Sequence, residues 1–159
     1  VNLKCDEKLC KELGAPKDIQ IVYTLTDNGI EIELTWFGKD ANRLTEAIFM
    51  RLFPANGSIA LHKLGDTVNP NSVVSKGSKN LHTVSDAEFK TDKNSYTFIN
   101  FDNPLISIGK GKILEFDNQF EEMEKYGISY VLYNNVWGTN FPLWYEDNAN
   151  FRFAVKLNK

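Results

Sequence analysis

The chain has 159 residues, a length that fits one domain with its own hydrophobic core, and residues 1–159 are treated as a single unit. Charged residues make up 25% of the chain and sum to a net charge of -3 with both signs interspersed, so no basic face for nucleic acid is expected. No apolar run approaches the roughly 20 residues that a membrane-spanning helix needs, so no membrane contact is expected either.

Residues 1–18 are expected to be a variable lead-in to a C-terminal piece of a larger multidomain protein, since position 1 is Val and no signal-like segment follows. Within this lead-in, Asp6 to Leu13 predicts a short helix that ends at Gly14. Cys5 and Cys10 are spaced too widely for a redox C-x-x-C motif and lack partners for a zinc site. They are interpreted as an incidental pair, with a local disulfide as the alternative.

A β-hairpin is the first strong strand signal in the chain. The alternating runs Ile19–Leu25 and Ile30–Trp36 flank Asn28-Gly29, a dipeptide typical of two-residue hairpin turns. A loop closed on Asn28-Gly29 predicts apolar pairs on one face and water-facing side chains on the other. The predicted pairs are Leu25 with Ile32, Tyr23 with Leu34 and Ile21 with Trp36, and the residues predicted to face water are Glu31, Glu33 and Thr35. Trp36 is predicted to lie in the core.

Many short strands follow, separated by turns rich in Gly, Pro, Asn and Asp. The predicted strands are Ala47–Phe53, Ser58–His62, His82–Phe89, Tyr96–Phe101, Ser107–Ile108 with Ile113–Phe116, Ile128–Asn134 and Phe151–Leu157. A further helical turn is possible over Asn118–Tyr126. The run Ile128–Asn134 is apolar on both sides and is predicted to be a central, doubly covered strand. The pattern predicts an all-β fold, an antiparallel β-sandwich with at most short helical turns.

The segment Leu132–Phe153 combines tryptophans with asparagines and connects the last two predicted core strands. Aromatic planes stack on sugar rings and amides or carboxylates bind hydroxyl groups, so the segment is a candidate carbohydrate-binding site. The competing interpretation is structural: the tryptophans cover one end of the sandwich and the asparagines bind loop backbone groups. The candidate site residues are Asn134, Asn135, Trp137, Asn140, Trp144, Tyr145 and Asp147.

Other chemical motifs are weak. His62 and His82 lie on different predicted strands without metal ligands at a recognisable spacing, so they are interpreted as hydrogen-bonded or surface histidines. The acidic pair Glu31 and Glu33 is interpreted as part of a solvated face rather than a glycosidase pair. No catalytic residue, metal ligand or cofactor site is assigned.

The runs NNVWGTNFPLWYEDNANFRF and LHKLGDTVNPNSVVSKGSKNLHTV resemble the C-terminal portion of a family of large proteins. The N-terminal parts of that family are similar to family 38 glycoside hydrolases, the α-mannosidase group. The resemblance implies a β-sandwich of the galactose-mutarotase-like supersandwich type. It also implies that zinc and an aspartate nucleophile belong to an upstream catalytic barrel, whose motifs do not occur in this chain.

Three hypotheses follow from the residues and the resemblance. The first is a noncatalytic accessory domain that packs on the upstream catalytic domain of its parent chain and lends a loop to the carbohydrate cleft. The second is an independent carbohydrate-binding module that binds a glycan through Trp137 and Trp144. The third is a purely structural or adhesive sandwich with an apolar patch for a partner domain.

Overall fold

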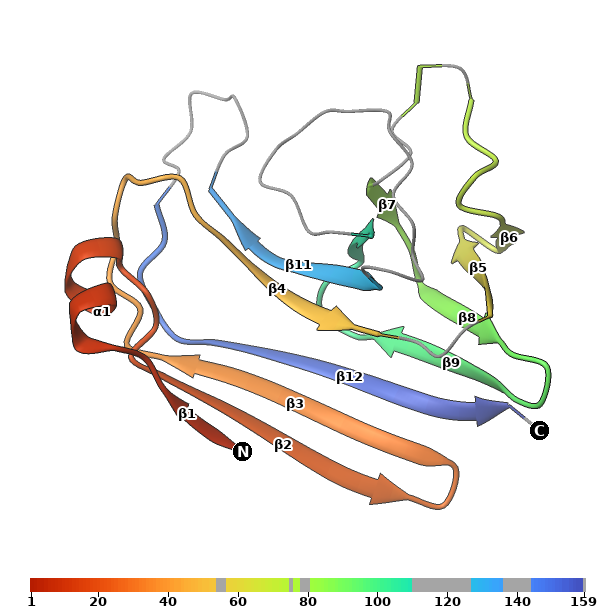
Figure 1. Cartoon of the computed structure of the whole chain (residues 1–159), viewed down its shortest axis with the longest axis horizontal. Helices are drawn as coiled ribbons and strands as arrows, with labels where there is room; N and C mark the ends of the chain where they lie inside the picture. Colours follow the sequence, from red (N-terminus) through yellow and green to blue (C-terminus); the bar gives the residue numbers. More distant parts are fainter. Residues whose placement is uncertain (54–56, 75, 78–80, 110–126, 136–143, 159) are drawn as a thin grey trace.

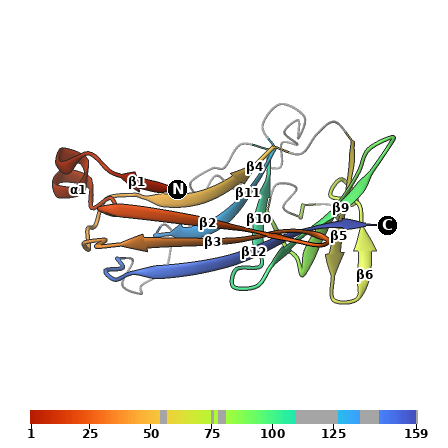
Figure 2. The ribbon, with the colours of Figure 1, turned by 90° about the horizontal axis from the view of Figure 1, so that it is seen from below.

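The structure is a computed structural model of the chain, and it describes residues 1–53, 57–74, 76–77, 81–109, 127–135 and 144–158. These residues form an antiparallel β-sandwich of two sheets, as the sequence predicts, with one short helix. Figure 2 shows β4 and β11 as a layer beside β2, β3 and β12. The elements are β1 (Asn2–Lys4), α1 (Glu7–Leu13), β2 (Asp18–Thr26), β3 (Gly29–Phe37), β4 (Ala47–Leu52), β5 (Ser58–Lys63), β6 (Asp66–Val68), β7 (Leu81–Thr83), β8 (Asp86–Lys90), β9 (Ser95–Asn100), β10 (Leu105–Ile108), β11 (Ile128–Asn134) and β12 (Ala149–Asn158).

The two sheets differ in size. The eight-stranded sheet has the order β1-β2-β3-β12-β9-β8-β5-β6, and the four-stranded sheet has the order β4-β11-β10-β7. The core between them contains Trp36, Phe89 and Phe153 from the larger sheet and Ile106 and Tyr130 from the smaller one. The rings of Tyr130 and Phe153 lie 5.5 Å apart between centroids, which places an aromatic contact between the two layers.

The predicted helix Asp6–Leu13 is confirmed as α1, which begins one residue later, at Glu7, and has Asp6 as its N-cap. The carboxylate of Asp6 accepts hydrogen bonds from the backbone N–H groups of Lys8 (2.9 Å) and Leu9 (3.2 Å), as an N-cap residue does. Gly14 adopts a left-handed conformation with φ 68° at the other end, and its N–H donates to the carbonyl of Cys10. The short strand β1, which the sequence analysis does not predict, pairs with β2 just before this helix.

The hairpin β2–β3 forms, but its predicted register is wrong by two residues. Thr26 pairs with Gly29, so the turn is Asp27-Asn28 and Leu25 lies opposite Ile30 instead of Ile32. Gly29 belongs to the strand because β12 comes close to it: a Cβ atom there would lie 1.8 Å from the carbonyl oxygen of Val155. A two-residue shift preserves the faces, since side chains alternate with a period of two.

The predicted single strand His82–Phe89 is also wrong, because the chain changes sheets in its middle. The backbone N–H of Val84 donates to the carbonyl of Pro104, beside the four-stranded sheet. The next N–H, from Ser85, donates to the carbonyl of His62 in the eight-stranded sheet. The run therefore divides into β7 and β8, one in each sheet.

The remaining strand predictions agree closely where the structure describes the chain. The strand β11 has the predicted bounds, and Ile128–Leu132 is buried throughout, which confirms a doubly covered strand. Trp36 is confirmed in the core at 2% exposure. The predicted strand Ile113–Phe116 and the helical turn Asn118–Tyr126 lie outside the described residues.

An exposed ion pair connects β12 to the turn after β9. Arg152 donates from Nη2 to Asp102 Oδ1 (2.8 Å) and from Nε to Asp102 Oδ2 (3.1 Å), and its backbone N–H donates to Oδ2 (2.7 Å). The side-chain hydrogen bonds from Arg152 hold the pKa of Asp102 below its usual range, against a smaller opposing effect of burial. This carboxylate therefore adds stability in its ionised form.

The lowered pKa of Asp102 predicts that the stability difference between the wild type and a variant without this carboxylate depends on pH. A carboxyl group with a lower pKa in the folded state stabilises the fold above its unfolded pKa of about 3.9, and this contribution disappears as the pH falls through the folded pKa. We expect Asp102→Asn to lower the melting temperature at pH 7, and the difference from wild type to shrink below about pH 4. Thermal melts of both proteins across this range test it. A difference that stays constant down to pH 3 would contradict it, and Glu31→Gln, at an exposed carboxylate of the same sheet, is the control at pH 7.

Candidate functional site

The candidate segment begins and ends at one end of the sandwich, beside α1 and the start of β4 (Figure 1). Asn134 and Asn135 stand at the end of β11, and residues 144–148 lead into β12. The loop 38–46, between β3 and β4, lies against both parts through side-chain and backbone hydrogen bonds. Trp137 and Asn140 lie outside the described residues.

Asn135 binds the protein's own backbone. It is 4% exposed, and its Oδ1 accepts a hydrogen bond from the N–H of Glu46 (2.8 Å) while its Nδ2 donates to the carbonyl of Leu44. Its backbone N–H also donates to the carbonyl of Glu46 (3.2 Å). In this arrangement the side-chain amide extends the ladder between β11 and β4 and does not face solvent, as the structural interpretation of the asparagines requires.

A buried ion pair holds the loop 38–46. The ammonium of Lys39 donates to Glu46 Oε1 (2.7 Å) and to the carbonyl of Gly14 at the end of α1 (3.2 Å), and the Lys39 side chain is fully buried. The Tyr133 ring centroid lies 5.2 Å from the same ammonium. Burial, followed by the Glu46 charge, raises the pKa of Tyr133 to about 12, so its hydroxyl stays protonated at neutral pH.

Tyr145 packs beside this ion pair. Its ring lies 5.9 Å from that of Tyr133, and its hydroxyl donates to the carbonyl of Asn148 (2.9 Å). Burial and, to a smaller extent, the charge of Asp147 raise the pKa of the Tyr145 hydroxyl. The position of Tyr145 therefore depends on Tyr133 and on its own turn.

Among the candidate residues that the structure describes, Trp144 and Asp147 are the exposed ones. Trp144 is 43% exposed, and the guanidinium carbon of Arg43 lies 4.7 Å from its ring centroid. Asp147 is exposed, its Oδ1 accepts from the N–H of Asn148 (2.7 Å), and its carbonyl accepts from Trp36 Nε1 (3.1 Å). An aromatic plane, a guanidinium and a carboxylate thus occur within one short stretch of the surface and the adjoining loop.

Arg43, Lys39 and Glu46 are missed by the sequence analysis. They come from a loop roughly 90 residues before Asn135 and carry no motif, since their roles depend on contacts across the fold. The only local signal is the polar composition of residues 38–46, which is ordinary for a loop.

The histidines have structural partners or lie in the core. His62 Nδ1 contacts Asp86 Oδ1 on the neighbouring strand, whereas His82 is 4% exposed. The sequence analysis interprets both as hydrogen-bonded or surface histidines; the contact of His62 with Asp86 agrees with this, and His82 is not a surface residue. Within the part of the chain that the structure describes, no group of three or more His, Cys, Asp or Glu side chains is arranged to hold a metal ion.

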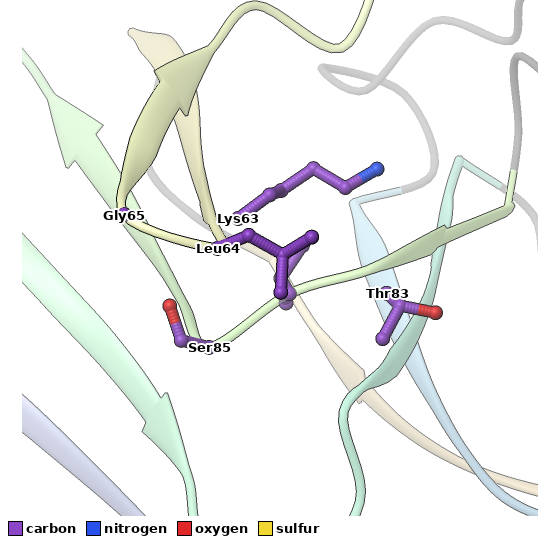
Figure 3. Close-up of a pocket in the computed structure, with 6 residues that line it drawn as sticks. Lys63, Leu64, Gly65, Thr83 and Ser85 are labelled. Carbon is purple, nitrogen blue, oxygen red and sulfur yellow. The ribbon is translucent and has the colours of Figure 1, made fainter.

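A hollow of about 460 Å³ lies where the chain crosses between the sheets (Figure 3). Lys63, Leu64 and Gly65 of the β5–β6 turn face Thr83 and Ser85 across it, and Val84 completes the lining. Leu64 is fully exposed and has a φ of 52°, a left-handed conformation that is unusual for a leucine. The polar side chains of the lining are those of Lys63, Thr83 and Ser85, and its six residues include no histidine or carboxylate.

The burial of the Lys39–Glu46 pair predicts that breaking it costs much more folding stability than breaking an exposed ion pair. Lys39→Met leaves the Glu46 carboxylate without its cation, and we expect the free energy of unfolding to fall by about 3–5 kcal/mol. The double variant Lys39→Met/Glu46→Leu is expected to recover part of this loss. Urea denaturation measures both values.

Lys17→Met is the matched control, because the Lys17–Asp40 pair (3.3 Å) has both side chains more than half exposed. It is expected to cost less than about 1 kcal/mol. Equal losses in Lys39→Met and Lys17→Met would show that the buried pair does not stabilise this end of the sandwich.

The helices of the structure and three comparisons with known proteins also bear on function. Across residues 1–53, 57–74, 76–77, 81–109, 127–135 and 144–158, the structure has no helix of the length and apolar character needed to cross a membrane. No protein-family model, curated protein or solved structure matches the chain. Its function is therefore a proposal that rests on its residues, their geometry and the resemblance of its sequence.

Proposed function

We propose that the chain is a noncatalytic accessory β-sandwich domain of a glycoside-hydrolase-like protein, similar to the α-mannosidase group, and that it packs on the catalytic domain of its parent chain. The observation that supports this proposal is an apolar strip on the inner face of the eight-stranded sheet. The strip comprises Tyr23, Leu25 and Leu157 and is called the uncovered strip below.

The uncovered strip belongs to the face that elsewhere forms the core. Tyr23 pairs with the buried Ile32, and paired residues on neighbouring strands direct their side chains to the same face. Leu157 follows Phe153 on the same side of β12, at a spacing of two strand periods. Yet Tyr23 is 53% exposed, Leu25 82% and Leu157 61%.

The unequal sizes of the sheets explain this exposure. Four strands cover part of an eight-stranded sheet, and the hairpin end of β2 and the last residues of β12 remain without a described covering layer. Adjacent exposed apolar side chains on a sheet face are typical of a surface that contacts another domain. The occupant that we propose is the upstream catalytic domain, because the resemblance to the α-mannosidase group implies a domain of that kind.

The same proposal gives the Trp144 end of the sandwich a role at the edge of the carbohydrate cleft. Trp144 and Asp147 are exposed there, and the buried Lys39–Glu46 pair and Tyr145 support the backbone that carries them. The supersandwich type of fold, with zinc held by the catalytic domain, remains a prediction from the resemblance.

An independent carbohydrate-binding module is the second candidate function. The half-exposed ring of Trp144, the Arg43 guanidinium and the Asp147 carboxylate favour it, because these groups supply stacking and hydrogen bonds to sugar hydroxyls. Arg43 lies over one side of the ring, so a sugar would stack on the other side.

The accessory-domain proposal predicts association in trans. When the catalytic domain encoded upstream is produced separately, we expect the chain to bind it, and Leu25→Lys to raise the Kd at least about tenfold by placing a charge in an apolar contact. Isothermal titration calorimetry measures the change. The pure chain is expected to leave an aryl α-mannoside unhydrolysed.

Thr24→Lys is the control. Thr24 lies between Tyr23 and Leu25 on β2 but faces the opposite side of the sheet with its partner Glu31, and the substitution adds the same single positive charge. It is expected to leave the Kd nearly unchanged. Absence of binding by the wild-type chain, or turnover of the aryl mannoside by the pure chain, would overturn the proposal.

The binding-module candidate predicts glycan binding by the chain alone. We expect Trp144→Ala to abolish binding on a glycan array, and Phe37→Ala, at another exposed aromatic residue, to leave it intact. Circular dichroism checks that both variants fold. If the wild-type chain binds no glycan, the binding module is excluded and the accessory domain remains.

A further inference from the structure

Cys5 and Cys10 flank the first turn of α1. Asp6 is the N-cap of this helix, so Cys5 is the residue before the cap and Cys10 is the fourth residue of the helix. The two positions are those of the hydrophobic staple, in which the side chain before the cap packs against that of the fourth helical residue. The two sulfurs are therefore directed to the same side of the turn.

Cys5 and Cys10 also share their surroundings. Both line one hollow of about 410 Å³, together with Lys4, Lys11 and Lys17 and two acidic residues. Cys5 is partly exposed and Cys10 is 7% exposed, and both are free thiols. The Cys10 thiol lies 3.8 Å from the carbonyl oxygen of Pro16, on the inner side of the helix.

We propose that Cys5 and Cys10 are a thiol–disulfide modification site, at which a low-molecular-weight anionic disulfide such as oxidised glutathione converts the staple pair into a disulfide. Glutathione carries net negative charge, and the lysines around the hollow outnumber its acidic residues, which favours an anionic reagent. Cys5 reacts first because it is the more exposed of the two sulfurs.

The chemistry is two consecutive thiol–disulfide exchanges. The Cys5 thiolate attacks one sulfur of oxidised glutathione, so a Cys5–glutathione bond forms and one glutathione thiolate leaves. The Cys10 thiolate then attacks Cys5 Sγ, the Cys5–Cys10 bond forms, and the second glutathione thiolate leaves. The two protein thiols lose two electrons in total, the glutathione disulfide gains them, and the protons of the two thiols pass to the leaving thiolates.

The disulfide would close a short loop across the N-cap of α1. The other end of this helix is already held, since the carbonyl of Gly14 accepts a hydrogen bond from the buried Lys39. Oxidation would thus add a covalent bond at the N-terminal end of α1, where Asp6 caps the helix and the Cys5 N–H donates to the carbonyl of Lys17. Burial, then the neighbouring Cys10 and Asp18, raise the pKa of Cys5, so the exchange is expected to accelerate as the pH rises above neutral.

The test is equilibration of the folded protein with oxidised and reduced glutathione, followed by intact mass and peptide mapping. We expect the wild type to lose the mass of two hydrogen atoms, with the bond mapped to Cys5–Cys10 and no dimer. In Cys10→Ser the reaction is expected to stop at the mixed disulfide, with one glutathionyl group on Cys5. The equilibrium constant for the intramolecular bond is expected to be at least about tenfold higher in the folded protein than in urea, because the staple raises the effective concentration of one thiol near the other.

Three results would overturn the proposal. The first is an equal equilibrium constant in folded and unfolded protein, which would mean that the fold does not bring the sulfurs together. The second is a wild-type protein that retains a glutathionyl group on Cys5, and the third is a dimer joined through cysteine. Cys5→Ser controls for folding, since it keeps the buried Cys10 and is expected to show no intramolecular bond.

Discussion

The buried ion pair between Lys39 and Glu46 is the interaction on which one end of the sandwich depends. The Lys39 ammonium contacts the end of α1, the loop between β3 and β4 and the ring of Tyr133 at the end of β11. Removing a charge from water is costly, so the pair is stable only because hydrogen bonds from several elements complete it. Its position therefore fixes α1, β4 and β11 relative to one another.

That constraint explains how a long connection can carry both structural and exposed residues. Asn135 and Tyr145 pack against the cluster, so their side chains stabilise the fold. Trp144 lies beside the Arg43 guanidinium and keeps 43% of its surface exposed. Asp147 uses its carbonyl to bind Trp36 in the core and leaves its carboxylate outside. In the described part of the candidate carbohydrate-binding segment, some residues therefore pack against the fold and others are exposed to solvent.

The difference in size between the eight-stranded and the four-stranded sheet also determines which surface is exposed. A sheet face needs a covering layer wherever its side chains are apolar, and the smaller sheet leaves the uncovered strip of Tyr23, Leu25 and Leu157 exposed. The opposite face is more polar: it carries Glu31, Glu33 and Arg152, with Val22 and Phe37 as exposed apolar residues. The asymmetry between the two faces of the same strands is what favours a domain contact on the inner one.

The sequence by itself determined the features that arise from local chemistry: the caps of α1, the alternating faces of β3 and β12, the fully buried character of β11 and the all-β class. It did not determine the hairpin register, because that depends on the close approach of β12 to Gly29. It did not reveal the change of sheet between His82 and Phe89, since the hydrogen-bond partners there come from Pro104 and His62. Only the tertiary structure decided which of the described asparagines and aromatics of the Leu132–Phe153 segment are buried. Lys39, Arg43 and Glu46 contact them from a distant part of the chain, and periodicity carries no information about such contacts.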